Sequence, residues 1–186
     1  MAFALRRLPR RRSPAREAGL IVALALTLLV ALLAATPARA REAVAVEPRW
    51  PAGAIVIRQS ERKLYFVAAP GLAIRYPVGV GKAGKAWFGA ARIDGKYVEP
   101  AWSPPREVKR DLPHLPDVIP GGSPKNPMGA RALTLDRGQY AIHGTTRAMR
   151  KSVGGAVSYG CIRMLNEDVI DLYDRVAVGA PVIVIP

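Results

Sequence analysis

The sequence predicts a mainly β domain whose strands pair antiparallel. Short runs rich in β-branched and aromatic residues follow one another, bounded by glycine, proline and polar residues, as strands are. The connections between the first of these runs are too short for crossover helices, so neighbouring strands should form hairpins. A single stretch, after residue 165, has the apolar spacing of an amphipathic helix.

The first 40 residues have the three parts of a secretory signal peptide. An arginine-rich start precedes an apolar run from Ala18 to Ala35, and Ala38-Arg39-Ala40 is a small-residue cleavage motif. We expect cleavage after Ala40 and export to the periplasm or cell envelope. Because roughly 18 apolar residues can span a bilayer, an uncleaved anchor is the alternative, and membrane contact is expected through this segment alone.

Charge and length limit the classes of protein that fit the rest of the chain. Residues 1–40 carry seven arginines and one glutamate, so the formal charge of +14 falls by six to +8 without them. A basic exported domain is attracted to anionic envelope polymers, and no motif for nucleic-acid binding is present. We place a lead-in without clear periodicity at 41–51 and one folded domain at 52–186.

The predicted elements follow in order along this domain. The predicted strands are residues 54–58, 63–67, 72–78, 131–136, 139–143 and 182–185. Alternation places His143 at a strand end, on the same face as Ala141. The helix begins at Asn166 as its cap, with Glu167 and Asp168 in the first turn, and ends before Gly179-Ala180-Pro181.

Two irregular segments lie between these elements. Residues 79–85 are rich in glycine and lysine but lack the spacing of a phosphate-binding loop, so we interpret them as a strand connection. Residues 100–127 hold eight of the 17 prolines, a density that disfavours regular elements. A connection this long is typical of a functional loop, and we expect one wall of a substrate cleft. A rigid surface loop is the alternative, and His114 within it should lie at the surface.

One thiol and one imidazole indicate the chemistry. The chain has one cysteine, Cys161, and two histidines, one of which is His143. Cys161 and His143 fall within a single loop excursion, and each lies beside a glycine that lets a substrate backbone approach closely. An imidazole within hydrogen-bond reach can take the thiol proton, and the thiolate paired with imidazolium attacks acyl carbons. The pattern predicts acyl transfer, with His143 as general base and then general acid. A buried structural thiol and a merely hydrogen-bonding histidine are the alternatives.

Neighbouring residues have predicted supporting roles. Backbone N–H groups around Tyr159, Gly160 and Cys161 are expected to stabilise a tetrahedral oxyanion. Arg163 is a candidate carboxylate clamp, or else an ion-pair partner of the two acidic residues in the first helical turn. Ser158 and Gly144 are assigned with it to the substrate side. One cysteine and two distant histidines do not supply the ligands of a zinc site, so neither metal nor cofactor is expected.

These motifs resemble a known family. Residues 142–145 and 158–164 are similar to the catalytic motifs of the L,D-transpeptidase (YkuD-type) domain of bacterial cell-wall enzymes. Residues 76–82, 102–105 and 124–133 are similar to its substrate-side loops, so the resemblance covers nearly everything after residue 50. One position departs, because Tyr159 stands where the family usually has histidine.

The resemblance implies a fold and a reaction. The fold is an antiparallel β-sandwich with one short helix after Cys161 and a long proline-rich loop. In the reaction, a peptidoglycan tetrapeptide stem acylates Cys161 and releases D-alanine, and the acyl group passes to an amine. That amine belongs to a diaminopimelate side chain in a 3-3 crosslink or to a lysine of an envelope protein. An L,D-carboxypeptidase or endopeptidase using the same pair, and a catalytically silent wall-binding protein, are the alternatives.

Overall fold

A computed structural model describes residues 41–186, and the predicted signal peptide, its cleavage site and the possible anchor lie outside these residues. The strands are β1 (Glu42–Ala45), β2 (Ile55–Arg58), β3 (Lys63–Ala69), β4 (Leu72–Pro77), β5 (Val80–Gly81), β6 (Gly89–Val98), β7 (Arg131–Leu135), β8 (Ala141–His143), β9 (Ala156–Ser158), β10 (Ile162–Arg163) and β11 (Pro181–Ile185). The helices are α2 (Arg106–Asp111), α3 (Asn166–Arg175) and the short 3-10 helix η1 (Arg150–Ser152). Within residues 41–186, no helix is long and apolar enough to cross a membrane.

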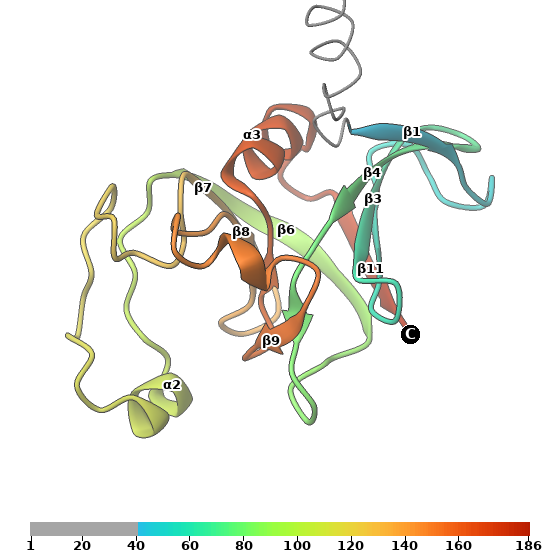
Figure 1. Cartoon of the computed structure of the whole chain (residues 1–186). Coiled ribbons are helices and arrows are strands. Elements are labelled where there is room, and N and C mark those ends of the chain that lie inside the picture. The colour runs from blue at the N-terminus through green and yellow to red at the C-terminus, as the bar shows by residue number, and fades with distance from the viewer. Residues whose placement is uncertain (1–40) are drawn as a thin grey trace, which may run out of the picture. The chain divides into compact units, whose positions relative to one another are not determined.

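Nine strands form one sheet in the order β1-β4-β3-β2-β11-β6-β7-β8-β10, and β5 pairs with β9 separately (Figure 1). The predicted mainly β class is confirmed, and so are the hairpins of β2, β3 and β4 and of β7 and β8. Not every pair in the sheet is antiparallel, because β11 runs parallel to β2 and β10 runs parallel to β8. A short connection forces antiparallel pairing only between consecutive strands. β2 and β11 are far apart in sequence, and β8 and β10 are separated by a loop, so these pairs can be parallel.

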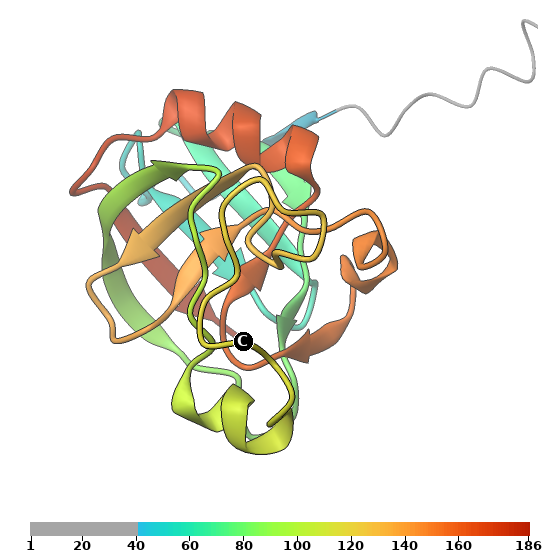
Figure 2. The ribbon, with the colours of Figure 1, turned by 90° about the vertical axis from the view of Figure 1, so that its left-hand side faces the viewer.

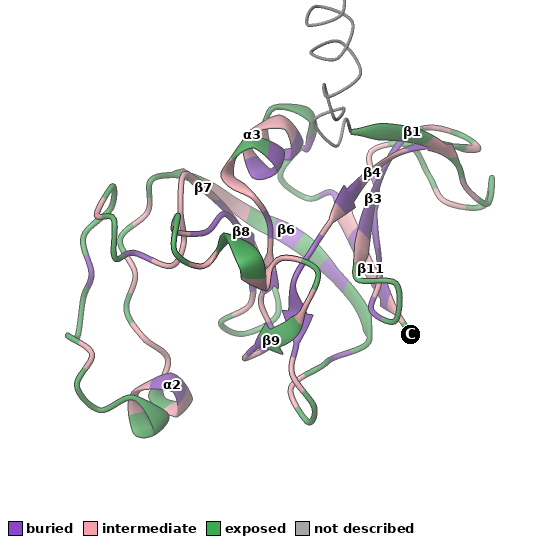
Figure 3. Ribbon diagram, in the orientation of Figure 1, coloured by how far each residue is buried: buried purple, intermediate pink, exposed green. Residues whose placement is uncertain are grey.

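The predicted lead-in contains a strand. β1 pairs antiparallel with β4, with Glu42 opposite Arg75. Arg41 reaches α3, where its Nη1 lies 3.1 Å from a carboxylate oxygen of Asp171. As an edge strand, β1 has one paired side and is mostly exposed, shown in green in Figure 3. An exposed strand carries little apolar alternation, which explains why the sequence did not reveal it.

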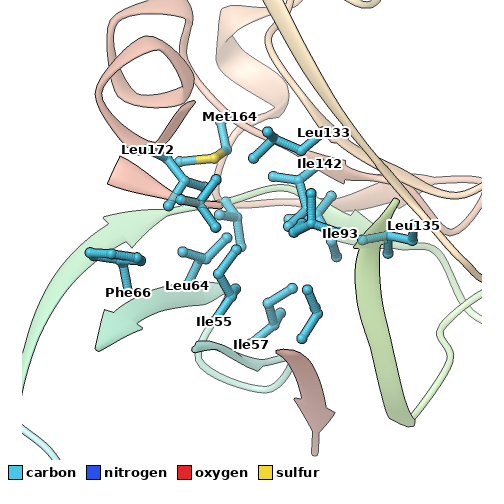
Figure 4. Packing of buried hydrophobic residues seen from close by; sticks show 14 of the residues in the cluster. Ile55, Ile57, Leu64, Phe66, Ile93, Leu133, Leu135, Ile142, Met164 and Leu172 are labelled. Carbon is cyan, nitrogen blue, oxygen red and sulfur yellow. The ribbon is translucent and has the colours of Figure 1, made fainter. Parts of the chain in front are cut away.

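The core lies between two halves of the sheet and α3. Figure 4 shows side chains of β2 and β3 facing those of β7, β8 and the segment leading into α3. Among its fully buried members are Ile55, Ile57, Leu64, Leu133, Ile142, Met164 and Leu172. On the other face of β2 and β3, Val56, Tyr65 and Val67 form a second, smaller cluster. Alternation along β2 therefore serves two apolar layers, and the first layer supports the strand that ends at His143.

Both helices correct a detail of the sequence interpretation. α3 confirms the predicted helix, with Val169 and Leu172 in the core, but Leu165 occupies the cap position and makes no side-chain cap bond. Asn166 is the first helical residue, and its side chain bonds elsewhere. α2 contradicts the expectation that no regular element exists within 100–127. It fits between prolines because Pro105 stands at its start, where no backbone N–H is needed.

Asp168 in the first turn of α3 is 7% exposed, and we predict that the burial of its carboxylate lowers the stability of the folded protein. Burial, with the charge of Glu167, raises the pKa of Asp168 to about 6 from an ordinary value of 3.8. The folded state thus binds more protons than the unfolded state between about pH 4 and pH 6, so stability is lost as the pH rises. Replacing Asp168 by asparagine should therefore stabilise the protein progressively over this range, reaching about 3 kcal/mol.

Urea unfolding at about pH 4 and about pH 6 measures this difference. Asp174→Asn, an exposed position on the same helix, is the matched control and should change little. An equal effect of Asp168→Asn at both pH values would show that Asp168 does not titrate as its burial implies.

Candidate active site

Two parallel strands bring Cys161 and His143 together. In the β8–β10 pair, Ile162 lies opposite Ile142 and Arg163 opposite His143. Continuing this register by one residue places Cys161 beside Ala141. Because residues two apart on a strand face the same side, Cys161, Arg163 and His143 all face one side of the sheet. All three line a cleft of about 1100 Å³.

The proline-rich loop forms the facing wall of this cleft, as predicted. Trp102, Val108 and Leu112, from the loop and α2, line the same cavity as Cys161. In Figure 2 this yellow-green segment lies in front of the sheet. His114 is exposed, as expected, and does not line the cleft. The sequence therefore located both sides of the cleft correctly.

His143 is held as a neutral imidazole. It is 4% exposed, and its Nδ1 lies 2.8 Å from the carbonyl oxygen of Gly144. Burial and the nearby charge of Arg163 lower the pKa of His143 to about 4, although the carbonyls of Gly144 and Pro127 offset part of the shift. Because a carbonyl can only accept, the proton belongs on Nδ1, which leaves the lone pair of Nε2 to receive another proton.

The resting thiol is also protonated in this environment, so the thiolate–imidazolium pair expected from the sequence would form only when His143 takes the thiol proton. Burial raises the pKa of Cys161, and this outweighs the opposite effects of a hydrogen bond from Ala141 and the charge of Arg163. Among the described residues, Sγ donates to the carbonyl of Gln139, 3.8 Å away, and not to His143. Proton transfer from Cys161 to His143 would therefore require Sγ to turn toward the imidazole.

The loop before Cys161 requires glycine at position 160. Gly160 has φ +119°, and a Cβ there would lie 2.4 Å from the ring of Tyr140. Tyr140 stacks on Trp87 with centroids 5.7 Å apart, and the Trp87 indole donates to the Gly160 carbonyl at 3.0 Å. An aromatic pair that the sequence did not single out therefore shapes the turn that presents Cys161.

Ser158 stabilises the turn at Gly160 with two hydrogen bonds. Its Oγ donates to the Cys161 carbonyl at 2.6 Å and accepts from the Gly160 N–H at 3.1 Å. The Gly160 N–H is thus already bonded, which differs from its predicted role as an oxyanion donor. Ser158 lines the cleft, but its hydroxyl is engaged in these two bonds.

Arg163 has no acidic partner among the described residues. Its Nη1 donates to the Ser152 hydroxyl at 2.8 Å, while its buried Nε has no hydrogen-bond partner. The alternative of an ion pair with the first turn of α3 is wrong, because Glu167 pairs with Arg150 at 2.6 Å and Asp168 lies 3.8 Å from Arg41. Arg163 is therefore a half-buried cation beside the thiol without a counter-ion.

Asn166 and Asn126 hold the surrounding loops and were not predicted as site residues. The Asn166 Oδ1 accepts from the N–H groups of Ala130 at 3.1 Å and Thr145 at 3.0 Å. A Cβ at Gly144 would lie 2.2 Å from this oxygen, so the packing around Asn166 requires glycine at position 144. The buried Asn126 amide donates to three carbonyls of the proline-rich loop. No local signal marks such residues, because their partners are distant in sequence.

Tyr159 links the turn that precedes Cys161 to α2. Its hydroxyl donates to Asp111 Oδ2 at 2.7 Å, and Lys82 Nζ lies 3.8 Å from its ring centroid. Tyr159→Phe should therefore loosen α2 without unfolding the domain, because one exposed hydrogen bond is worth about 0.5–1.5 kcal/mol. Hydrogen exchange of the α2 amides should become faster by up to about tenfold.

Tyr65→Phe is the matched control for this prediction, since it removes a tyrosine hydrogen bond to Glu61 on the opposite part of the sheet. It should leave α2 exchange unchanged. Equal α2 protection in wild type and Tyr159→Phe would mean that the Asp111 contact does not hold the helix.

The fold and the cleft define a β-sheet domain with a candidate cysteine nucleophile and histidine base. Residues 52–184 match the family model of the L,D-transpeptidase catalytic domain (YkuD), and the chain belongs to this family. Probable L,D-transpeptidase YbiS of Escherichia coli strain K12 is 36% identical over 137 residues, which are 69% of this chain and 43% of that protein. The chain thus spans less than half the length of this relative.

Solved structures show the same fold. L,D-transpeptidase 3 of Mycobacterium tuberculosis, in complex with a faropenem-derived adduct, has a TM-score of 0.56 at 18% identity, covering 73% of this chain and 61% of that one. A Brucella melitensis protein described as a probable carnitine operon oxidoreductase caia has a TM-score of 0.52 at 38% identity, covering 78% and 93%. The oxidoreductase description is that protein's own and carries no argument for this chain.

Proposed function

We propose that this protein is a peptidoglycan L,D-transpeptidase, with Cys161 as nucleophile and His143 as general base. The observation that carries the proposal is the placement of both side chains on one face of two adjacent strands, lining one cleft. Membership of the L,D-transpeptidase family supports peptidoglycan peptides as the substrate class, and the acyl donor in this proposal is a tetrapeptide stem. We place the catalytic domain at 52–186, with the preceding 1–40 as an export signal that directs it to the periplasm or cell envelope.

The geometry supports a concerted first step. The imidazole Nε2 takes the proton from Sγ as sulfur bonds to the carbonyl carbon before the terminal D-alanine. The tetrahedral intermediate collapses, the carbon–nitrogen bond breaks, and the imidazolium returns the proton to the departing amine. D-alanine leaves and a thioester remains on Cys161. An amine then attacks the thioester, His143 accepts its proton, and the thiol is released.

Two supporting groups complete the proposal. Arg163 binds a carboxylate of the stem, because it is a cation that faces the cleft without a counter-ion. The backbone N–H groups of Tyr159 and Cys161 stabilise the oxyanion, with Gly160 shaping their turn. The acyl acceptor is the side-chain amine of a second stem or a lysine of an envelope protein.

Intact-mass analysis after exposure to faropenem tests the nucleophile. Wild type should gain the mass of one adduct and Cys161→Ala none. Wild type without an adduct, or an adduct that persists in Cys161→Ala, would favour a catalytically silent wall-binding protein.

Product analysis with a disaccharide tetrapeptide tests the reaction type. Released D-alanine together with crosslinked or amine-exchanged products is expected for a transpeptidase. Release of D-alanine with the hydrolysed tripeptide as the sole partner product would identify a carboxypeptidase that uses water as the acceptor.

A further inference from the structure

A second cavity, of about 580 Å³, lies next to the candidate active site and shares no lining residue with it. One segment separates the two. Pro127 and Met128 line the cleft, whereas Asn126, Gly129 and Ala130 line the second cavity. Residues 145–148, which directly follow His143-Gly144, complete its wall. Its volume lies in the range of about 300–1000 Å³ that is typical of small-molecule sites.

The charged side chains lining this cavity are one acid and one base, Glu99 and Arg147. Five of the six glutamates within residues 41–186 form ion pairs with arginine or lysine, and Glu99 is the exception. Arg147 likewise forms no ion pair in this part of the chain, although Glu99 lies in the same cavity. The two side chains thus form no ion pair with each other, and both are exposed and available to a ligand.

The backbone, and not a counter-ion, holds Glu99 in place. Glu99 has φ +42°, a left-handed conformation that is unfavourable for a residue with a side chain. Its N–H donates to the Ala130 carbonyl at 3.0 Å. Two glycines make room for it, because a Cβ at Gly121 would lie 1.9 Å from the Glu99 carbonyl oxygen and one at Gly122 would lie 3.2 Å from its carboxylate. Strained residues of this kind cluster at ligand sites.

Thr145 provides a third polar group. It is 1% exposed and lines the cavity, and its Oγ1 has no hydrogen-bond partner among the described residues. A buried hydroxyl without a partner is unfavourable, so the wall of the cavity carries one unsatisfied polar group beneath its surface.

We propose that this cavity binds a small zwitterion, an α-amino acid, whose ammonium group pairs with Glu99 and whose carboxylate pairs with Arg147. A molecule with both charges on one carbon satisfies both side chains at once, whereas a simple anion or cation leaves one of them unpaired. The proposal does not depend on the transpeptidase activity, because no step involves Cys161.

Amide chemical shifts of the full-length, isotope-labelled chain test the proposal by titration with D-alanine, L-alanine, acetate and methylamine. Shifts that saturate with an alanine enantiomer should appear at residues 145–148 and 121–123. Acetate and methylamine should bind at least about tenfold more weakly, since each loses one ion pair. Binding of acetate as tight as that of alanine, shifts confined to the cleft around Cys161, or no saturable shift would overturn it.

Charge-neutralising variants, each with a matched control, test whether Glu99 and Arg147 bind the amino acid. Glu99→Gln and Arg147→Gln should each weaken alanine binding by at least about tenfold. Asp174→Asn and Lys151→Gln, which make the same charge changes at exposed positions outside both cavities, should leave it unchanged. Equal weakening by the controls would show that the effect is net charge and would reject the site. Retained acylation of Cys161 in the Glu99 and Arg147 variants would separate this result from the proposed function.

Discussion

Replacing His143 by alanine is expected to lower the rate of Cys161 acylation by a factor of about 100 to 10,000, the range that a positioned general base contributes. The effect should lie at the upper end, because burial raises the pKa of Cys161 and leaves little thiolate to react without a base. Rapid mixing with faropenem and time-resolved intact mass measures the rate directly.

His114→Ala is the matched control, since His114 is exposed in the proline-rich loop and does not line the cleft. It should acylate at the wild-type rate. Acylation of His143→Ala at the wild-type rate would mean that another group accepts the thiol proton, and the general-base assignment would be wrong.

The pH dependence of acylation gives a second readout for His143. The imidazole accepts a proton only when neutral, and its pKa in the folded protein is about 4 instead of 6.5. The acylation rate should therefore persist as the pH falls from about 7 to about 5 and decline near pH 4. A decline centred near pH 6.5 would indicate a solvated imidazole, contrary to its burial.

Replacing Asn166 by alanine is expected to lower the free energy of unfolding by about 2–6 kcal/mol. Its Oδ1 is the acceptor for the N–H groups of Ala130 and Thr145, and each buried donor left without a partner costs about 1–3 kcal/mol. Urea unfolding measures the change. Because Thr145 follows His143-Gly144 directly, the acylation rate should fall as well.

Asn166→Asp keeps an oxygen in the same place and adds a negative charge at the start of α3, where the helix dipole favours it. This variant should retain most of the stability that alanine loses. If Asn166→Asp and Asn166→Ala were equally destabilised, the loss would come from packing and not from the two hydrogen bonds.

Secondary structure was predicted correctly from sequence where several consecutive segments carry the same local pattern. The runs that became β2, β3 and β4 are β-branched or aromatic, bounded by turn residues, and close enough in sequence to pair as hairpins. It failed for β1 and α2, whose stability comes from contacts outside their own segment. β1 depends on one edge of β4, and α2 is joined to the sheet domain by Lys85 and Tyr159.

The candidate site divides in the same way. The sequence alone indicated acyl-transfer chemistry, from the residue types of Cys161 and His143, their adjacent glycines and their spacing. The resting protonation states followed from burial, which lowers the pKa of His143 to about 4 and raises the pKa of Cys161. Burial depends on which segments cover a side chain, and no local pattern specifies that.

The amino-acid sequence by itself determined the class of fold and the family motifs and indicated the candidate pair of reactive side chains, because these depend on residue type and on short-range spacing. Tertiary structure alone decided that Asn166 holds two loops, that Arg163 has no counter-ion, and that Glu99 and Arg147 line one cavity. These facts are set by contacts between segments that are distant along the chain, and a one-dimensional pattern does not record which of them meet.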